Sequence, residues 1–167
     1  ILEFKLDFFN KSEQSILLNA ENIIVGFSGG VDSTLVLAAT NQFLEAHNKK
    51  NCLTALHVNH QTQSDSSSWQ IHCEKFCKEH NINFSCKSVE IKESGQGYEA
   101  AARSARLDIF NAFDEATVII LGHHLDDQVE TVFFRVLRGT GLKGLTGMQR
   151  HLKIKDKDFI RPLLHLS

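Results

Sequence analysis

With 167 residues, the chain has the length of a single domain, 1–167, that buries a sizeable core. Its 18 Lys and Arg nearly balance its 20 Asp and Glu, and no apolar run approaches the length that spans a bilayer, so we expect no membrane partner. Its four cysteines form no C-x-x-C pair and follow no signal peptide, which disfavours a zinc site and indicates reduced thiols in a cytoplasmic protein.

The first predicted elements are a helical lead-in and a strand that breaks into glycines. Residues 1–19 have apolar side chains at roughly helical spacing, which predicts a helix beside a sheet. The run 23–27 is short, apolar and rich in β-branched residues, so it predicts a buried strand. The strand ends at Ser28-Gly29-Gly30, and the residues that follow return to helical spacing. The pattern is therefore strand, glycine-rich loop, helix.

This loop has the chemistry of a phosphate site. Two glycines allow a tight turn and close approach of a ligand, while the N–H groups and positive dipole of the following helix attract anions. Ser28 and Ser33 add hydroxyl donors. Asp32 repels phosphate unless a divalent cation lies between them, and Mg²⁺ is the usual bridge. The segment predicts a nucleotide site with Mg²⁺; the alternative is a glycine-rich turn before a helix capped by Asp32.

The two best-known phosphate loops do not fit, because the segment has neither a Walker lysine nor a third glycine. Ser-Gly-Gly-Val-Asp-Ser instead resembles the PP-loop of the N-type ATP pyrophosphatases. This resemblance implies ATP as the cofactor, cleavage between its α and β phosphates, and release of pyrophosphate. It also implies ATP contacts from Ser28, Gly29, Gly30, Val31, Asp32 and Ser33.

Residues 52–60 predict a second strand with a polar end. Ligands bind beyond the carboxyl ends of strands in open α/β sheets, so His57, Asn59 and His60 fall on the side of Ser28. The segment His-Val-Asn-His resembles one in the lysidine synthases, where this strand lies against adenine, which implies cofactor binding by His57 and Asn59. Zinc binding by the two histidines is disfavoured, because a strand directs them to opposite faces.

Residues 64–80 predict a helix and residues 82–91 a third strand, with Trp69 expected to pack rather than to stack on a ligand. In the next predicted helix, Glu99 and Arg103 are i, i+4 neighbours, and the plain interpretation is a surface ion pair. Lysidine synthases have a similar Glu-x-x-x-Arg-x-x-Arg helix beside the active site. The resemblance therefore implies catalytic roles for both residues.

Residues 117–122 form the most apolar predicted strand, and it leads into His-His-Leu-Asp-Asp. Acidic residues at a helix start can be simple caps. Here, however, two carboxylates fall at the edge where Asp32 already lies, and three acids facing a triphosphate are tolerable only around a cation. The predicted roles are metal binding by Asp32 and Asp127, catalysis by Asp32, Asp126 and Asp127, and cofactor binding by His123, with proton transfer or phosphate contact left open between His123 and His124.

The C-terminal end is basic. Residues 1–133 carry 10 basic and 18 acidic side chains, whereas residues 134–167 carry 8 basic and 2 acidic ones. This asymmetry suggests an anionic partner there, although a solvated tail is the plain alternative. Residues 138–144 are glycine-rich and positively charged, so we predict a loop in which Arg138 and Lys143 contact a phosphate backbone; the alternative is a flexible connector. The resemblance to the lysidine synthases implies that this backbone belongs to tRNA.

Alternating strands and helices predict a doubly wound α/β domain with a mostly parallel five-stranded sheet and helices on both faces. The block Gly-His-His-x-Asp-Asp-Gln-x-Glu-Thr makes the resemblance specific to the tRNA(Ile)-lysidine synthase family. Residues 23–164 resemble the catalytic domain of that family. That resemblance implies ligation of free lysine to the wobble cytidine of tRNA(Ile), with a homodimer left open. We expect a fragment that lacks C-terminal tRNA-binding domains, binds ATP and modifies tRNA poorly. The alternatives are a PP-loop tRNA thiolase, disfavoured without C-x-x-C, another amide-forming ligase, and a non-catalytic nucleotide sensor.

Overall fold

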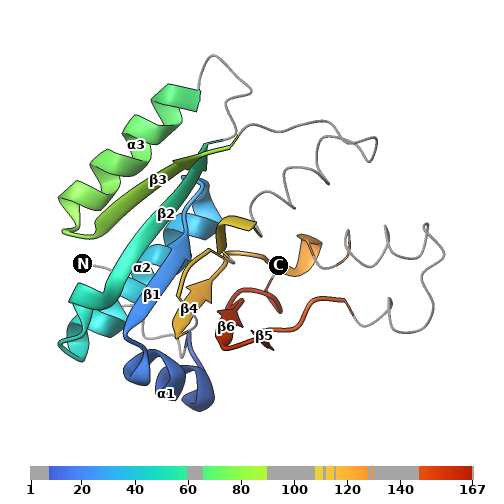
Figure 1. Ribbon diagram of the computed structural model, residues 1–167. Coiled ribbons are helices and arrows are strands. Elements are labelled where there is room, and N and C mark those ends of the chain that lie inside the picture. The colour runs from blue at the N-terminus through green and yellow to red at the C-terminus, as the bar shows by residue number, and fades with distance from the viewer. Residues whose placement is uncertain are drawn as a thin grey trace.

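The computed structural model describes residues 8–59, 66–89, 108–110, 112–114, 116–127, 129 and 147–166. Within them a six-stranded sheet has the order β3-β2-β1-β4-β6-β5 (Figure 1). The strands are β1 (Asn22–Gly26), β2 (Leu53–Asn59), β3 (Asn83–Ser88), β4 (Thr117–Ile120), β5 (His151–Ile154) and β6 (Lys157–Ile160). Neighbouring strands are parallel except β5 against β6. The mostly parallel α/β fold is confirmed; the predicted number of strands was one too low, because both strands of the C-terminal hairpin join the sheet.

Three helices cover one face of this sheet: α1 (Lys11–Asn19), α2 (Val31–Ala46) and α3 (Ser66–Glu79), with a short 3-10 turn, η1 (Lys50–Cys52), before β2. Their apolar sides meet alternate strand residues in the larger core cluster, which includes Leu17, Val25, Phe27, Val36, Leu37, Leu44, Ala55, Cys73, Cys77 and Ile120. The opposite face buries Ile24, Leu56, Phe110, Ile119 and Phe159. Residues 108–110 are helical, so both faces carry helix. No helix within the described ranges is long and apolar enough to cross a membrane.

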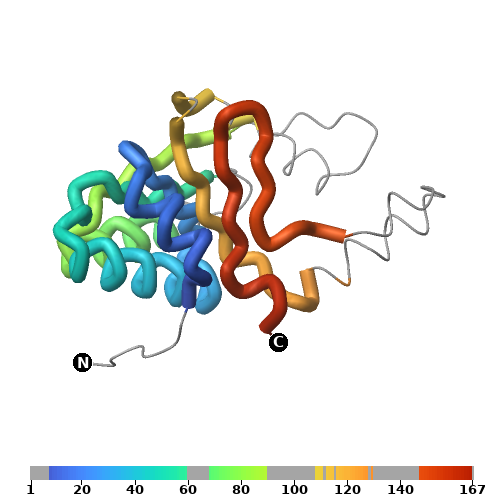
Figure 2. Tube along the Cα trace, turned by 90° about the horizontal axis from the view of Figure 1, so that it is seen from below, coloured from blue at the N-terminus to red at the C-terminus, as the bar shows by residue number. Residues whose placement is uncertain are grey.

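A buried ion pair joins α1 to the C-terminal hairpin. The Arg150 side chain donates from Nε to Oε1 of Glu13 at 2.7 Å and from Nη2 to Oε2 at 3.0 Å, and Glu13 is 1% exposed. Arg150 also donates to the carbonyl oxygens of Pro162 and Phe8, at 2.7 and 2.9 Å. Figure 2 shows α1 in blue beside the red C-terminal segment. The pair ties α1 to the end of the sheet that β6 and the edge strand β5 form.

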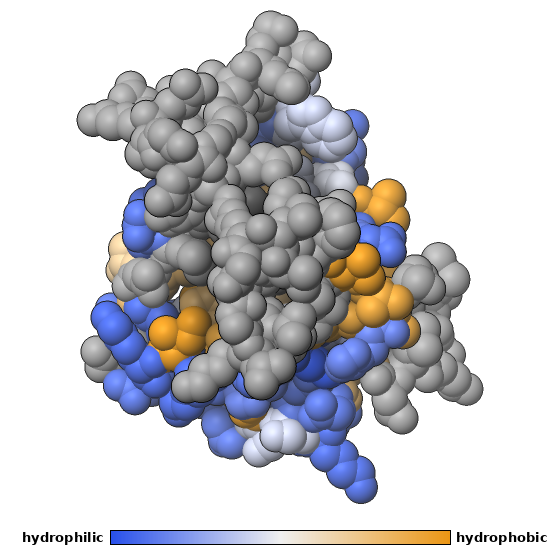
Figure 3. Space-filling view, turned by 90° about the vertical axis from the view of Figure 1, so that its right-hand side faces the viewer, coloured by the Kyte–Doolittle hydropathy of each residue, from blue (hydrophilic) through white to orange (hydrophobic). Residues whose placement is uncertain are grey.

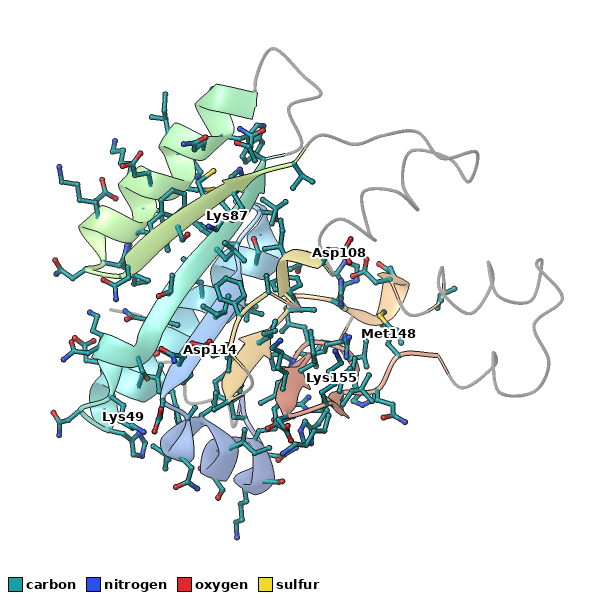
Figure 4. All side chains as sticks on the ribbon, in the orientation of Figure 1. Lys49, Lys87, Asp108, Asp114, Met148 and Lys155 are labelled. Carbon is teal, nitrogen blue, oxygen red and sulfur yellow. The ribbon has the colours of Figure 1, made fainter. Side chains whose placement is uncertain are left out.

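The parallel strands bring four chain segments to one edge of the sheet. Because β1, β2, β4 and β6 run in the same direction, their carboxyl ends lead to Ser28, Asn59, Leu121 and Arg161 at this edge. Lys49, which follows α2, lies at the opposite end of the sheet (Figure 4). The described surface on the side shown in Figure 3 is mostly hydrophilic, with scattered hydrophobic groups. The carboxyl edge is therefore where a ligand site is expected.

Candidate active site

The loop between β1 and α2 is shaped by its own hydroxyls and one left-handed glycine. Gly29 has φ of 88°, a value that L side chains rarely adopt. The Oγ atoms of Ser28 and Ser33 lie 3.0 Å apart, and Ser33 Oγ donates to the Gly30 carbonyl oxygen at 3.0 Å. Gly30 is the N-cap of α2 and supplies no side chain to cap the helix. The first-turn N–H groups of a 16-residue helix therefore face the loop without a side-chain cap at Gly30.

The acidic residues of two distant segments meet beside this loop. Nε2 of His124 lies 3.8 Å from Oδ2 of Asp32 and 3.7 Å from Oδ2 of Asp127. Oδ2 of Asp126 lies 3.8 Å from Nδ1 of the same histidine. Asp32 belongs to the first turn of α2, whereas the other three residues follow β4. The imidazole of His124 is thus the point where carboxylates from both segments converge.

Gly122 allows this approach. A Cβ built on Gly122 would lie 3.1 Å from the backbone nitrogen of Ser33 and 3.2 Å from the carbonyl carbon of Asp32. These are backbone atoms in a helical first turn, so they cannot move aside as the end of a flexible side chain can. Only glycine lets the end of β4 pack this closely against α2. The sequence analysis assigned no role to this residue.

The structure shows a capping hydrogen bond at the acidic pair, as the simpler of the two interpretations expects. The backbone N–H of His124 donates to Oδ2 of Asp127 at 2.9 Å, and the N–H of Asp126 donates to Nδ1 of His124 at 3.2 Å. Because Nδ1 accepts this bond, the neutral imidazole carries its proton on Nε2, the nitrogen that faces Asp32 and Asp127. Capping therefore orients Asp127 without removing its negative charge.

The donor set suits a hard divalent cation. Mg²⁺ is usually bound through one or two carboxylates together with substrate phosphates and water, rather than by an all-protein cage. Asp32 and Asp127 are such carboxylates, and both are partly exposed. Among the described residues, no group of three or more His, Cys, Asp and Glu is arranged to hold a metal by itself. The residues fit Mg²⁺ that takes its remaining ligands from phosphate and water.

The other residues predicted to bind the cofactor differ in what surrounds their side chains. Asn59, at the end of β2, donates from Nδ2 to Oε1 of Gln70 at 3.4 Å. His123 accepts on Nδ1 from Nε of Arg161 at 3.3 Å, which brings a guanidinium to the carboxyl edge. The sequence analysis missed Arg161, although its place directly after β6 was a usable signal. Val31 is 83% exposed at the start of α2.

His57 does not present its side chain at the edge. It is 6% exposed, and its Nδ1 lies 2.9 Å from the carbonyl oxygen of Phe27, directly before the loop. Cofactor binding by His57, which the resemblance implies through the main chain of this strand, stays a prediction, and the buried side chain itself is engaged with Phe27. A strand alternates its side chains between faces, and His57 falls on the face that α3 covers.

A pocket of about 340 Å³ lies between the loop and α3, lined by Gly29, Ser68, Trp69 and His72. Trp69 is 50% exposed and packs its ring edge-on against His72, with centroids 6.0 Å apart. The packing role expected for Trp69 is present, and its partner is the loop itself. Glu99, Arg103, Arg138 and Lys143 lie outside the described residues, as does His60.

Comparison with known proteins identifies the family. A family model described as a PP-loop domain matches residues 3–167. The chain belongs to the PP-loop domain family. It is 40% identical over 145 residues to a tRNA(Ile)-lysidine synthase of Legionella pneumophila (strain Lens), covering 86% of this chain and 33% of the relative. Its identity to a tRNA(Ile)-lysidine synthase of Francisella tularensis (strain SCHU S4 / Schu 4) is 35% over 149 residues, covering 87% and 36%. This PP-loop domain thus spans about a third of the length of these relatives.

Among solved structures, the PP-loop domain is similar to the U34-tRNA thiolase NcsA from Methanococcus maripaludis with its [4Fe-4S] cluster. The TM-score is 0.63 at 23% identity, and the match covers 92% of this chain and 54% of the thiolase. This likeness supports the fold. It agrees with the observed mostly parallel sheet with helices.

Proposed function

We propose that this PP-loop domain binds ATP with Mg²⁺ and adenylates the wobble cytidine of tRNA(Ile), after which free lysine replaces AMP to give lysidine. The relatives that carry this name support the substrate. The observation that carries the proposal is the convergence of Asp32 and Asp127 on His124, beside the first turn of α2. This arrangement offers amides for phosphate and carboxylates for a cation at one place.

In the proposed first step, the C2 carbonyl oxygen of cytidine attacks the α-phosphorus of ATP. An oxygen–phosphorus bond forms, the bond between the α-phosphorus and the bridging oxygen breaks, and pyrophosphate leaves. The loop holds the phosphates through backbone N–H groups and through the hydroxyls of Ser28 and Ser33. Asp32 and Asp127 would hold Mg²⁺, which when bound would neutralise part of the negative charge of the phosphates.

In the second step, the amine of lysine attacks C2, the carbon–oxygen bond to AMP breaks, and AMP leaves. The proton that the attacking amine loses passes to water or to the phosphate of the departing AMP. Nδ1 of His124 accepts the N–H of Asp126, so the proton of the neutral imidazole is on Nε2, which faces Asp32 and Asp127 at 3.8 and 3.7 Å. We therefore do not assign the role of base to this imidazole. His123 is tied to Arg161 through Nδ1, which makes a phosphate contact the better proposal for this pair.

The thiolase alternative draws support from the solved structure with a similar fold. The described cysteines argue against it. Cys73 and Cys77 of α3 are fully buried, and burial raises the pKa of their thiols to about 11 and about 12, with a smaller contribution from a neighbouring cysteine. Burial also raises the pKa of Cys52 and Cys86. Thiolates are the form that attacks sulfur or binds a cluster, so these thiols are suited to packing.

The test, made on the full-length protein, is transfer of radiolabelled lysine to total tRNA, together with pyrophosphate release when tRNA or lysine is omitted. We expect release that requires tRNA and transfer that requires ATP. Asp127→Asn keeps an oxygen that can cap His124 but removes the charge, so it should fold normally and lose at least about a hundredfold in pyrophosphate release. Full activity of Asp127→Asn would reduce the carboxylate to a cap and refute its metal role. Sulfide-dependent product would favour the thiolase.

A further inference from the structure

We propose that Trp69, Cys73 and His57 are positioning residues that hold the phosphate loop in its anion-binding conformation from outside the loop. The inference rests on the proposed binding of ATP at this loop. It gives α3 a role in phosphate binding, although we place none of the three side chains in contact with the phosphates. The three residues come from α3 and β2 and contact the two positions on either side of Ser28.

Gly29 is packed against α3. A Cβ at Gly29 would lie 2.9 Å from Sγ of Cys73 and 3.0 Å from Cε3 of Trp69, so both side chains cover the backbone at this residue. Gly29 is also the loop residue with φ of 88°, and this dihedral decides where the next amide points. The side chains of α3 thus set the orientation of the residue on which the loop turns.

The carbonyl group of Phe27, directly before the loop, is held by the side chain of His57. The carbonyl oxygen can only accept, so the Nδ1 of His57 at 2.9 Å carries the proton. Sγ of Cys73 lies 3.7 Å from the same nitrogen. Burial raises the pKa of Cys73 to about 11, so the group beside His57 is a neutral thiol. Cys73 therefore touches both the histidine that holds Phe27 and the glycine at the turn.

External support of this kind matters because the hydroxyl bonds within the loop join Ser28, Gly30 and Ser33 and do not involve Gly29. A glycine has the largest backbone freedom of any residue, so its amide stays aligned with the phosphates only if something restricts it. Trp69 and Cys73 supply that restriction across the pocket wall. Their removal should weaken phosphate binding without removing any phosphate ligand.

Trp69 also makes the inference measurable, because it is the only tryptophan of the chain. It is half-exposed, so Trp69→Ala removes surface rather than core. We expect Trp69→Ala to raise the Kd for MgATP about fivefold by calorimetry, the size of one lost aligned contact, and Trp69→Phe to stay within about twofold. In the parent protein, ATP and tripolyphosphate should change the tryptophan emission alike, because the signal travels through the loop.

Cys73 and Cys77 provide a matched pair. Both are buried thiols of α3 in the same core cluster, but Cys73 touches Gly29 and Cys77 lies one turn further along the helix. We expect Cys73→Ala and Cys77→Ala to lower Tm similarly, while only Cys73→Ala raises the Kd for MgATP about fivefold.

Equal Kd values for the parent protein, Trp69→Ala and Cys73→Ala would overturn the inference, as would equal weakening by the two cysteine variants. An emission change that requires the adenosine part of ATP would also overturn it, because Trp69 would then contact the base. Failure of the parent protein to bind ATP would instead refute the proposed function, and the inference with it.

Discussion

Replacing Gly122 with alanine tests whether the two halves of the site must touch. The added methyl group would lie 3.1 Å from the nitrogen of Ser33 and 3.2 Å from its Cα, closer than an ordinary contact. Both atoms belong to the first turn of α2, and Gly122 follows β4, whose Val118 and Ile120 are buried in the core. Relief requires the end of β4 to move away from α2 by a few tenths of an ångström or more. His124 and Asp127 move with it.

The cost falls mainly on activity. Overpacking of this kind costs about 1–3 kcal/mol of folding free energy, which a domain of this size survives. A displacement of about 1 Å between groups that act on one phosphate can lower a rate about a hundredfold. The shift needed here is a few tenths of an ångström, so we expect Gly122→Ala to fold, with a modestly lower Tm, and to lose up to about tenfold in ATP-dependent pyrophosphate release.

The assay is pyrophosphate release at saturating ATP, tRNA and lysine, with urea unfolding measured in parallel. Gly30→Ala is the control for folding, because a Cβ there would meet only Oγ of Ser28, at 3.5 Å, and its stability should change by less than about 0.5 kcal/mol. Retention of full activity by a folded Gly122→Ala would refute the argument that close contact between β4 and α2 sets the site. Loss of folding alone would show that the contact is structural.

Three further predictions concern the core and the metal. Glu13→Gln leaves the Arg150 guanidinium without its charged partner, so it should lower the free energy of unfolding in urea by about 1.5–3 kcal/mol, because Arg150 is partly exposed and keeps the carbonyl oxygens of Pro162 and Phe8; replacing both residues with apolar ones should cost less. Burial raises the pKa of Cys77 from 9.0 to about 12, so as the pH rises the unfolded chain releases this proton before the folded one. The free energy of unfolding should therefore fall above pH 9 by up to about 1.4 kcal/mol per pH unit. In Cys77→Val, the free energy of unfolding measured in urea should depend less steeply on pH. In the parent protein, chelation of divalent cations should weaken ATP binding about tenfold or more, as measured by calorimetry. In the double variant Asp32→Asn/Asp127→Asn, chelation should weaken ATP binding much less. Equal weakening of ATP binding in the parent protein and the double variant would contradict the metal assignment.

Local pattern was enough to predict the centre of the site. The apolar strand before Ser28, the glycines after it and the apolar strand before His123 are each legible from a few residues. Parallel strands place their carboxyl ends together, so the meeting of Asp32 with Asp127 followed from topology without any side-chain detail. The meeting of these segments could be predicted because each step depended on short sequence separation and one general rule, whereas the catalytic and metal-binding roles of the residues stay predictions.

Contacts between distant residues were not predictable in this way. His57 was placed at the ligand edge because its strand ends there, yet the alternation of the strand buries its imidazole against Phe27, 30 residues earlier. The pair of Glu13 and Arg150 joins positions 137 residues apart, and neither has a local signal that marks it as buried. A Cβ added at Gly122 would have no space, and the only reason is that α2 lies there. Such features depend on packing between elements, which periodicity does not encode.

The same distinction limits the charge argument for an anionic partner at the C-terminal end. The count of 8 basic and 2 acidic side chains in residues 134–167 treats every charge as available. In the structure Arg150 is neutralised by Glu13, Lys157 is 6% exposed, and Lys153 lies 3.9 Å from Asp158. Arg161, by contrast, stands at the carboxyl edge beside His123. Attraction of RNA phosphate by the described residues should therefore depend more on this one guanidinium near the site than on the summed charge of the hairpin.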